Sequence, residues 1–214
     1  VLESKIENLK IINDMFKNCE NLIKVNLTGL DFNGVGDISG MFDECINLNE
    51  IIFNEITNTK EVMTMESMFR GCKKISSINI SSFSSFENVK SLSNLFKGCK
   101  NLTNINFPAK VNARQVTNIS NIFAQCHRLE SFDFGNFTFE NLVDASYIFF
   151  ECFSLTSVGL FDFNCTQCVT IKGLFQYSKI LPIADLCSFW VSEKLQDVSF
   201  LSYGCPYIEI LILC

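Results

Sequence analysis

The stretch NLFKGCKNLTNINF, Asn94–Phe107, decides the fold because variants of it recur eight times along the 214-residue chain. An aligned phenylalanine returns every 26 or 27 residues, at Phe16, Phe42, Phe69, Phe96, Phe123, Phe149 and Phe175, with Ser202 in the eighth unit. Three residues later stand Cys19, Cys45, Cys72, Cys99, Cys126, Cys152, Ser178 and Cys205. A fixed period of this length is the signature of a repeat architecture.

The hydrophobic period changes within one unit. One face of a short helix is predicted by the apolar spacing of Val89, Leu92, Leu95, Phe96 and Cys99. Glycine just before the cysteine, as at Gly98, suits a helix end because glycine adopts positive φ easily. The period then falls to two, with Ile105 and Phe107 alternating with asparagines, which predicts a short strand.

These patterns predict an α/β solenoid that resembles leucine-rich-repeat proteins. We expect about eight units of 26–27 residues, each with one short helix and one short parallel strand. A single unit cannot bury its apolar side alone, but stacked neighbours bury it together. Residues 1–214 therefore form a single repeat array, which we expect to be a segment of a longer solenoid protein.

The unit Met65–Phe83, MESMFRGCKKISSINISSF, resembles the BspA-type surface-protein repeats, relatives of the leucine-rich repeat. The likeness extends over essentially the whole chain and weakens in the seventh unit, at Ser178, Pro182 and Ala184. It implies a surface-exposed adhesion or binding protein. The family fixes no catalytic residue and no cofactor, so the resemblance carries no site with it.

Bulk composition excludes several classes of protein. The net charge of −6 and the pI near 4.9 leave no basic surface for a nucleic-acid backbone. No run of about 18 uncharged apolar residues is present, so we expect no membrane span. The 48% of hydrophobic residues is enough for a large core.

The cysteine column allows three interpretations: disulfides, metal or catalytic thiols, or small buried side chains. Cysteine is often buried as a small hydrophobe, and serine replaces it at Ser178, so burial is favoured. The pair Cys165 and Cys168 forms a lone C-x-x-C, a weak signal for metal or redox chemistry. In an oxidising compartment, Cys165 could instead pair with Cys187.

No constellation of catalytic residues is visible in the sequence. His127, the only histidine, follows Cys126, but the equivalent positions hold solvent-facing types such as Lys73 and Lys100. Glycine-rich phosphate loops and hydrolase or metalloprotease motifs are missing. We expect a protein that is not an enzyme, with no catalytic residue, metal or cofactor.

The outward positions of the predicted strands form the candidate concave binding face. Its members are small and polar: Asn26, Asn79, Asn104, Asn106, Ser131 and Asp133. Extended concave faces are what solenoids use to bind partners, although such residues also simply solvate a sheet. Towards the C-terminal end the face becomes apolar at Ile183, Ile210 and Ile212, which predicts contact with further repeats or a cap.

Possible glycosylation sites with the N-x-[ST] pattern occur at Asn26, Asn79, Asn101, Asn118, Asn136 and Asn164. They favour an extracellular or cell-surface recognition and adhesion module that binds a protein or glycan partner. The lack of an evident disulfide framework favours the alternative, an intracellular scaffold subunit of a large assembly.

Overall fold

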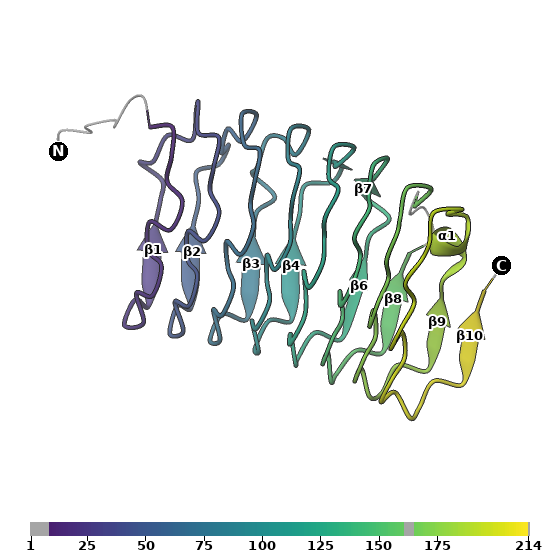
Figure 1. Ribbon diagram of the computed structural model, residues 1–214. Coiled ribbons are helices and arrows are strands. Elements are labelled where there is room, and N and C mark those ends of the chain that lie inside the picture. Colours follow the sequence, from purple (N-terminus) through teal and green to yellow (C-terminus); the bar gives the residue numbers. More distant parts are fainter. Residues whose placement is uncertain (1–8, 161–164, 214) are drawn as a thin grey trace.

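The computed structural model describes residues 9–160 and 165–213, which wind into one elongated parallel β-solenoid (Figure 1). Eight strands occupy equivalent places in successive turns of the chain: β1 (Lys24–Asn26), β2 (Glu50–Ile52), β3 (Ser77–Asn79), β4 (Asn104–Asn106), β6 (Ser131–Asp133), β8 (Ser157–Gly159), β9 (Ile183–Asp185) and β10 (Ile210–Ile212). We call their outward side the strand face. The predicted parallel strands are confirmed.

The strands pair two by two instead of forming one continuous ladder. Parallel pairs join β1 to β2, β3 to β4, β6 to β8 and β9 to β10. A second column is continuous, because seven single bridges join Ile11, Asp37, Thr64, Ser91, Asn118, Asp144, Thr170 and Asp197. The rungs are therefore registered mainly on this second side.

The prediction of a helix in every unit is wrong. The segment predicted to be helical is a chain of tight turns, and the one α-helix of the described residues is α1 (Cys187–Trp190), in the seventh unit. The amide of Leu95 donates to the carbonyl of Leu92 (3.2 Å), and that of Cys99 donates to Phe96 (3.0 Å). Both are turn bonds between residues three apart, not the four of an α-helix.

Two residues in each unit have a left-handed backbone conformation with positive φ, and they form two columns along the array. Asn94 has φ 57° and Gly98 has φ 75°, and every unit repeats this spacing of four. The amides of Asn94, Phe96 and Gly98 then donate to carbonyls of the next rung at 2.8–2.9 Å. A right-handed helix cannot include such residues. The expected positive φ at Gly98 is confirmed, and Gly71 and Gly204, which also precede the cysteine, share it; these glycines lie inside turns and not at helix ends.

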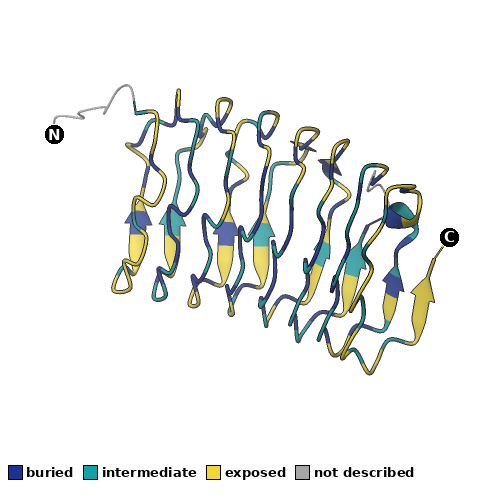
Figure 2. Cartoon of the chain, in the orientation of Figure 1, coloured by how far each residue is buried: buried dark blue, intermediate teal, exposed yellow. Residues whose placement is uncertain are grey.

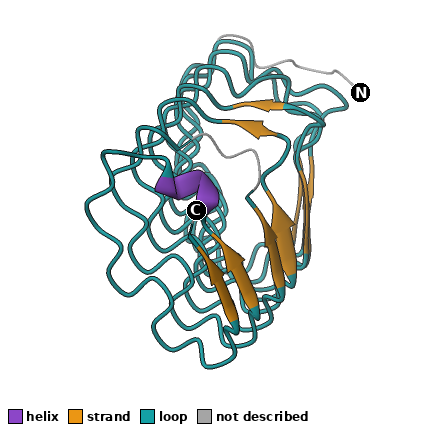
Figure 3. Cartoon of the chain, turned by 90° about the vertical axis from the view of Figure 1, so that its right-hand side faces the viewer, coloured by secondary structure: helices purple, strands orange, loops and turns teal. Residues whose placement is uncertain are grey.

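The third side of the coil carries shorter pairings. β5 (Val111–Asn112) pairs in parallel with β7 (Phe137–Thr138), and a single bridge joins Thr57 to Phe83. Seen along the array in Figure 3, these two strands lie apart from the longer strand column. The helix α1 lies beyond β9 in the seventh unit.

The apolar side chains predicted for the helix face are nevertheless the core. Val89, Leu92, Leu95, Phe96 and Cys99 are all 0–1% exposed. The phenylalanine rings stack nearly parallel from rung to rung, with centroids 5.4–5.9 Å apart from Phe16 to Phe175. Linked turns bring the same positions inward as a helix would, which is why the spacing suggested one.

Candidate functional site

Several strands of the strand face contain exposed residues on either side of a more buried one (Figure 2). In β3, Ser77 and Asn79 are exposed while Ile78 is buried, and β1 has the same pattern. An exposed ion pair, Lys24 Nζ to Glu50 Oε2 at 2.9 Å, links β1 to β2. The residues of β1 and β3 that were predicted to point outward are exposed.

The six predicted binding residues fall into two groups. Asn26, Asn79 and Asp133 each accept a backbone amide two residues ahead, from Thr28, Ser81 and Gly135, at 2.8–3.1 Å. These three side chains stabilise the turn after their strand. The side chains of Asn104, Asn106 and Ser131 make no hydrogen bond to the described residues, so all of their polar atoms are available to a partner.

The cysteine column forms a regular set of hydrogen bonds that the sequence reasoning missed. Six of its seven thiols donate to the carbonyl of the aligned phenylalanine one rung earlier, all but the exposed Cys19 of the first unit. The bonds run from Cys45 to Phe16, Cys72 to Phe42, Cys99 to Phe69, Cys126 to Phe96, Cys152 to Phe123 and Cys205 to Phe175, at 2.8–3.2 Å. We call these side chains, with Ser178, the thiol ladder. Ser178 makes the same bond to Phe149 at 2.6 Å.

The serine substitution was the signal that could have revealed this role. Cysteine and serine are both small, but they also share a hydrogen-bond donor that alanine lacks. The thiol ladder therefore packs as expected and also gives a buried carbonyl a second hydrogen bond in each rung.

Exchanging the ladder residue Cys99 tests this role. We expect Cys99→Ser to change the free energy of unfolding by less than about 1 kcal/mol, and Cys99→Ala to reduce it by about 1–2 kcal/mol, because only alanine removes the donor. Chemical denaturation of both variants measures the difference. If size alone mattered, alanine would be tolerated at least as well as the more polar serine.

Burial makes these thiols unreactive. It raises the pKa of Cys45 to about 11 and moves the pKa of Cys72, Cys99 and Cys126 well above the usual value. The thiolate is the nucleophile and the metal ligand. No group of three or more His, Cys, Asp or Glu side chains in residues 9–160 and 165–213 is placed to hold a metal ion.

The expected pairing of Cys165 with Cys187 is not present. Cys165 is a free thiol that is fully buried, while Cys187 takes part in a different disulfide. Cys168 is also free and buried, and its thiol lies 3.4 Å from the Thr170 carbonyl oxygen. Both members of the C-x-x-C are thus core residues.

His127 does not form a pair with Cys126. The Cys126 thiol is directed to the Phe96 carbonyl, and the His127 ring stacks on Phe153 with centroids 4.6 Å apart. Burial, with a smaller contribution from the charge of Lys100, lowers the pKa of His127.

The sequons differ in accessibility. Asn26 and Asn79 are exposed on the strand face, while Asn101, Asn118 and Asn136 are half-buried. Asn118 accepts the amide of Ser120 at 2.8 Å, and the Asn136 amide group donates to Pro108 at 2.9 Å. Asn164 lies outside the described residues. Asn26 and Asn79 are the sites most open to a glycan.

A polar groove on another side of the array was not predicted. It has a volume of about 640 Å³ and is lined by residues that include Lys90, Arg114, Glu140 and Asn141. Its groups largely satisfy one another: Arg114 pairs with Glu140 at 3.0 Å, and the Asn141 amide donates to the Arg114 carbonyl at 2.8 Å.

The fold defines a parallel β-solenoid of leucine-rich-repeat-like units, confirming the predicted repeat architecture. A family model described as "Mycoplasma protein of unknown function, DUF285" matches residues 10–107 and 85–190. The chain belongs to this family, and its assignment to the BspA-type repeats is confirmed.

Two solved structures resemble the chain weakly. A leucine-rich repeat protein from Bacteroides ovatus ATCC 8483 is 17% identical with a TM-score of 0.37; the match covers 97% of this chain and 65% of that one, less than two thirds of its length. A leucine-rich cell surface protein from Faecalibacterium prausnitzii A2-165 is 16% identical with a TM-score of 0.32, covering 95% and 76%. No curated protein matches the chain.

No helix in the described part of the chain is both long and apolar enough to cross a bilayer.

Proposed function

We propose that this solenoid is a non-enzymatic recognition and adhesion module at the cell surface, binding a protein or glycan partner. The observation that carries the proposal is the strand face, an extended polar surface repeated across successive rungs. Asn104, Asn106 and Ser131 supply its free hydrogen-bonding groups, and binding would sum many weak contacts.

The disulfide at Cys187 supports an oxidising compartment, where such bonds persist. Nine free cysteines among the described residues favour the alternative, an intracellular scaffold subunit. Burial of most of them reduces the weight of that observation, because buried thiols resist oxidation in either compartment.

Apolar exposure at the C-terminal end supports contact with further repeats or a cap. Ile183 and Ile210 are each 49% exposed on the strand face, and all three residues of β10 are exposed (Figure 2). The amides of Phe200 and Ser202 have no acceptor in the described residues, whereas their equivalents one rung earlier, Gly173 and Phe175, donate across rungs.

Mass spectrometry of the protein from its native source tests the compartment. Free thiols are alkylated under native conditions, and the protein is then digested. We expect glycan on Asn26, which lies in β1 and not beside Asn104, Asn106 or Ser131, together with Cys187 protected as a disulfide and rapid labelling of the exposed Cys19. A glycan on Asn79, which pairs with Asn106, would cover the strand face and contradict binding through it. Bare asparagines together with a reduced Cys187 would instead favour the intracellular scaffold.

Binding through the strand face is tested separately by Asn104→Ala/Asn106→Ala/Ser131→Ala. Beads coated with this variant should attach to cells several-fold less than beads coated with the parent. Thr103→Ala is the matched control, because Thr103 is also exposed but its hydroxyl donates to Ser76 at 3.1 Å. Equal attachment of parent and triple variant would contradict binding through this face.

A further inference from the structure

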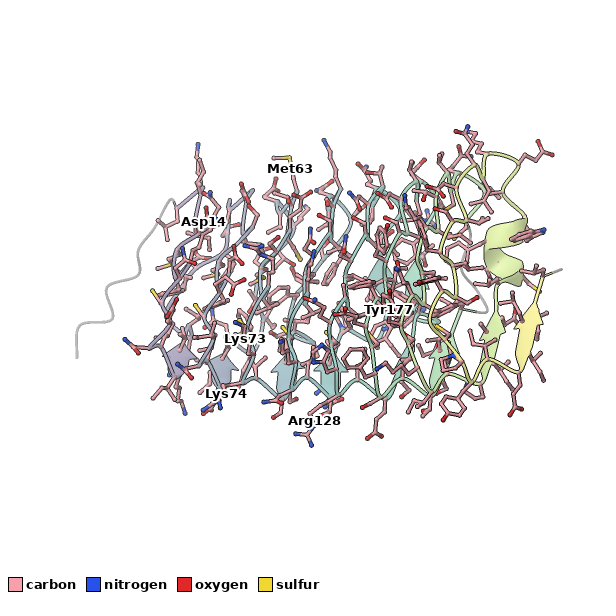
Figure 4. All side chains as sticks on the ribbon, turned by 60° about the horizontal axis from the view of Figure 1, so that its bottom comes forward. Asp14, Met63, Lys73, Lys74, Arg128 and Tyr177 are labelled. Carbon is pink, nitrogen blue, oxygen red and sulfur yellow. The ribbon has the colours of Figure 1, made fainter. Side chains whose placement is uncertain are left out.

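A row of basic side chains follows one edge of this acidic solenoid. Each residue comes one or two positions after a thiol-ladder residue, where the turns lead into the strand face. The row consists of Lys73, Lys74, Lys100, Arg128 and Lys179, all exposed, and we call it the basic edge. Figure 4 shows Lys74 and Arg128 along the same lower border of the molecule.

These cations are not neutralised by the protein itself. The ion pairs of the described residues use Lys17, Lys24, Arg70, Arg114 and Lys172, and none uses the basic edge. Adjacent rungs are roughly 4.8 Å apart, so like charges are held close together in successive turns. Like charges facing each other across neighbouring strands destabilise a fold. An anionic ligand would remove this repulsion.

An ordered aromatic platform lies within the row. The His127 ring stacks on Phe153, and the Lys179 ammonium lies 5.0 Å from the centre of the Phe153 ring. The His127 Nε2 atom is buried and has no hydrogen-bond partner. Asn101, half-buried beside Lys100, offers an amide without a hydrogen bond to the described residues. The edge thus combines positive charge with aromatic packing that positions Lys179 and with unpaired polar groups.

We propose that the basic edge binds an anionic polysaccharide, with carboxylate or sulfate groups of successive sugars set against successive rungs. The spacing of the rungs, about 4.8 Å, is close to the length of one pyranose ring in a chain. The half-buried His127 ring, whose Nε2 atom has no hydrogen-bond partner, lies among these cations and offers a polar contact for a sugar. The single row of charges suits one narrow polyanionic chain better than a nucleic-acid duplex, whose phosphates lie on two strands.

This inference rests on the proposed recognition function but not on the strand face. It adds a ligand class and a second surface, so the two can fail independently.

The test compares two variants that lose the same charge. Lys73→Gln/Lys100→Gln/Arg128→Gln removes the centre of the basic edge, and Lys60→Gln/Lys90→Gln/Lys110→Gln removes three exposed lysines elsewhere, one of them in the polar groove. Immobilised heparin and polygalacturonate are the probes, with neutral dextran, duplex DNA and phosphatidylserine vesicles as comparisons. Dissociation constants are measured at several salt concentrations.

We expect the parent to bind heparin or polygalacturonate and not dextran. The basic-edge variant should bind at least tenfold more weakly and show a shallower salt dependence, because fewer counterions are released. The control variant should stay within about twofold of the parent. All changed side chains are exposed, so the thermal unfolding of both variants should match the parent.

Absence of binding by the parent, or equal loss in both variants, would overturn the inference. Tighter binding to vesicles or DNA than to the glycans would overturn it as well. Attachment of coated beads to cells, measured in parallel, separates the proposals. If the parent attaches to cells but does not bind the anionic glycans, only the assignment of the basic edge is wrong. If the parent does not attach to cells at all, the proposed recognition function is wrong.

Discussion

Raising the pH above about 9 should unfold this protein cooperatively, because its core contains many thiols that cannot ionise while they are buried. Cys72, Cys99, Cys126 and Cys152 are fully buried in the thiol ladder, and burial raises the pKa of each. In the unfolded chain the same thiols lose their protons from about pH 8.5 upward.

The sign of the effect follows from proton binding. Between the unfolded and folded pKa values the unfolded chain binds fewer protons than the folded protein, so stability falls as pH rises. Each thiol contributes about 1.4 kcal/mol per pH unit, and four of them about 5–6 kcal/mol per unit. Since a typical domain is stable by about 5–15 kcal/mol, we expect unfolding within about two pH units.

Circular dichroism and thermal unfolding from pH 7 to 11, in a reducing buffer, measure this loss. The matched control replaces all four cysteines by serine, which retains the donor seen at Ser178 and does not titrate in this range. The control should lose about half of the dependence on alkaline pH and keep the part due to the remaining buried thiols Cys45, Cys165 and Cys168, whose pKa values burial also raises. The same unfolding pH for parent and control would contradict the explanation.

Phe96→Ala should have the largest effect of any single core substitution discussed here, lowering the free energy of unfolding by about 3–5 kcal/mol. Phe96 is 0% exposed, and its ring stacks between Phe69 at 5.5 Å and Phe123 at 5.6 Å. Truncation leaves a cavity in the middle of the stack. Each rung also stabilises its neighbours, so the loss should spread along the array.

Urea denaturation of the variant measures the change, with His127→Ala as the control. His127 is half-buried and contacts mainly Phe153, so its removal should cost about 1 kcal/mol or less. Similar, small losses for the two variants would show that the aligned phenylalanines do not form a buried stack.

How far the site could be predicted depended on the kind of interaction. The outward direction of Asn104 and Asn106 followed from strand alternation alone. Strand alternation did not predict which residues of the strand face are already hydrogen-bonded, because the bonds accepted by Asn26 and Asn79 depend on the turn that follows each strand. The negative net charge gave no indication of the basic edge, because Lys73, Lys100 and Arg128 come together only when the rungs stack.

The sequence by itself determined the repeat, its period, the parallel strands and the buried columns, because periodicity reports which side chains face inward. It did not determine the backbone path between those side chains. A helix and a pair of turns can both bury side chains at the spacing of Leu92, Phe96 and Cys99. The tertiary structure decided between them, because neighbouring rungs accept the amides of Asn94, Phe96 and Gly98 and so stabilise left-handed residues that an isolated unit would avoid.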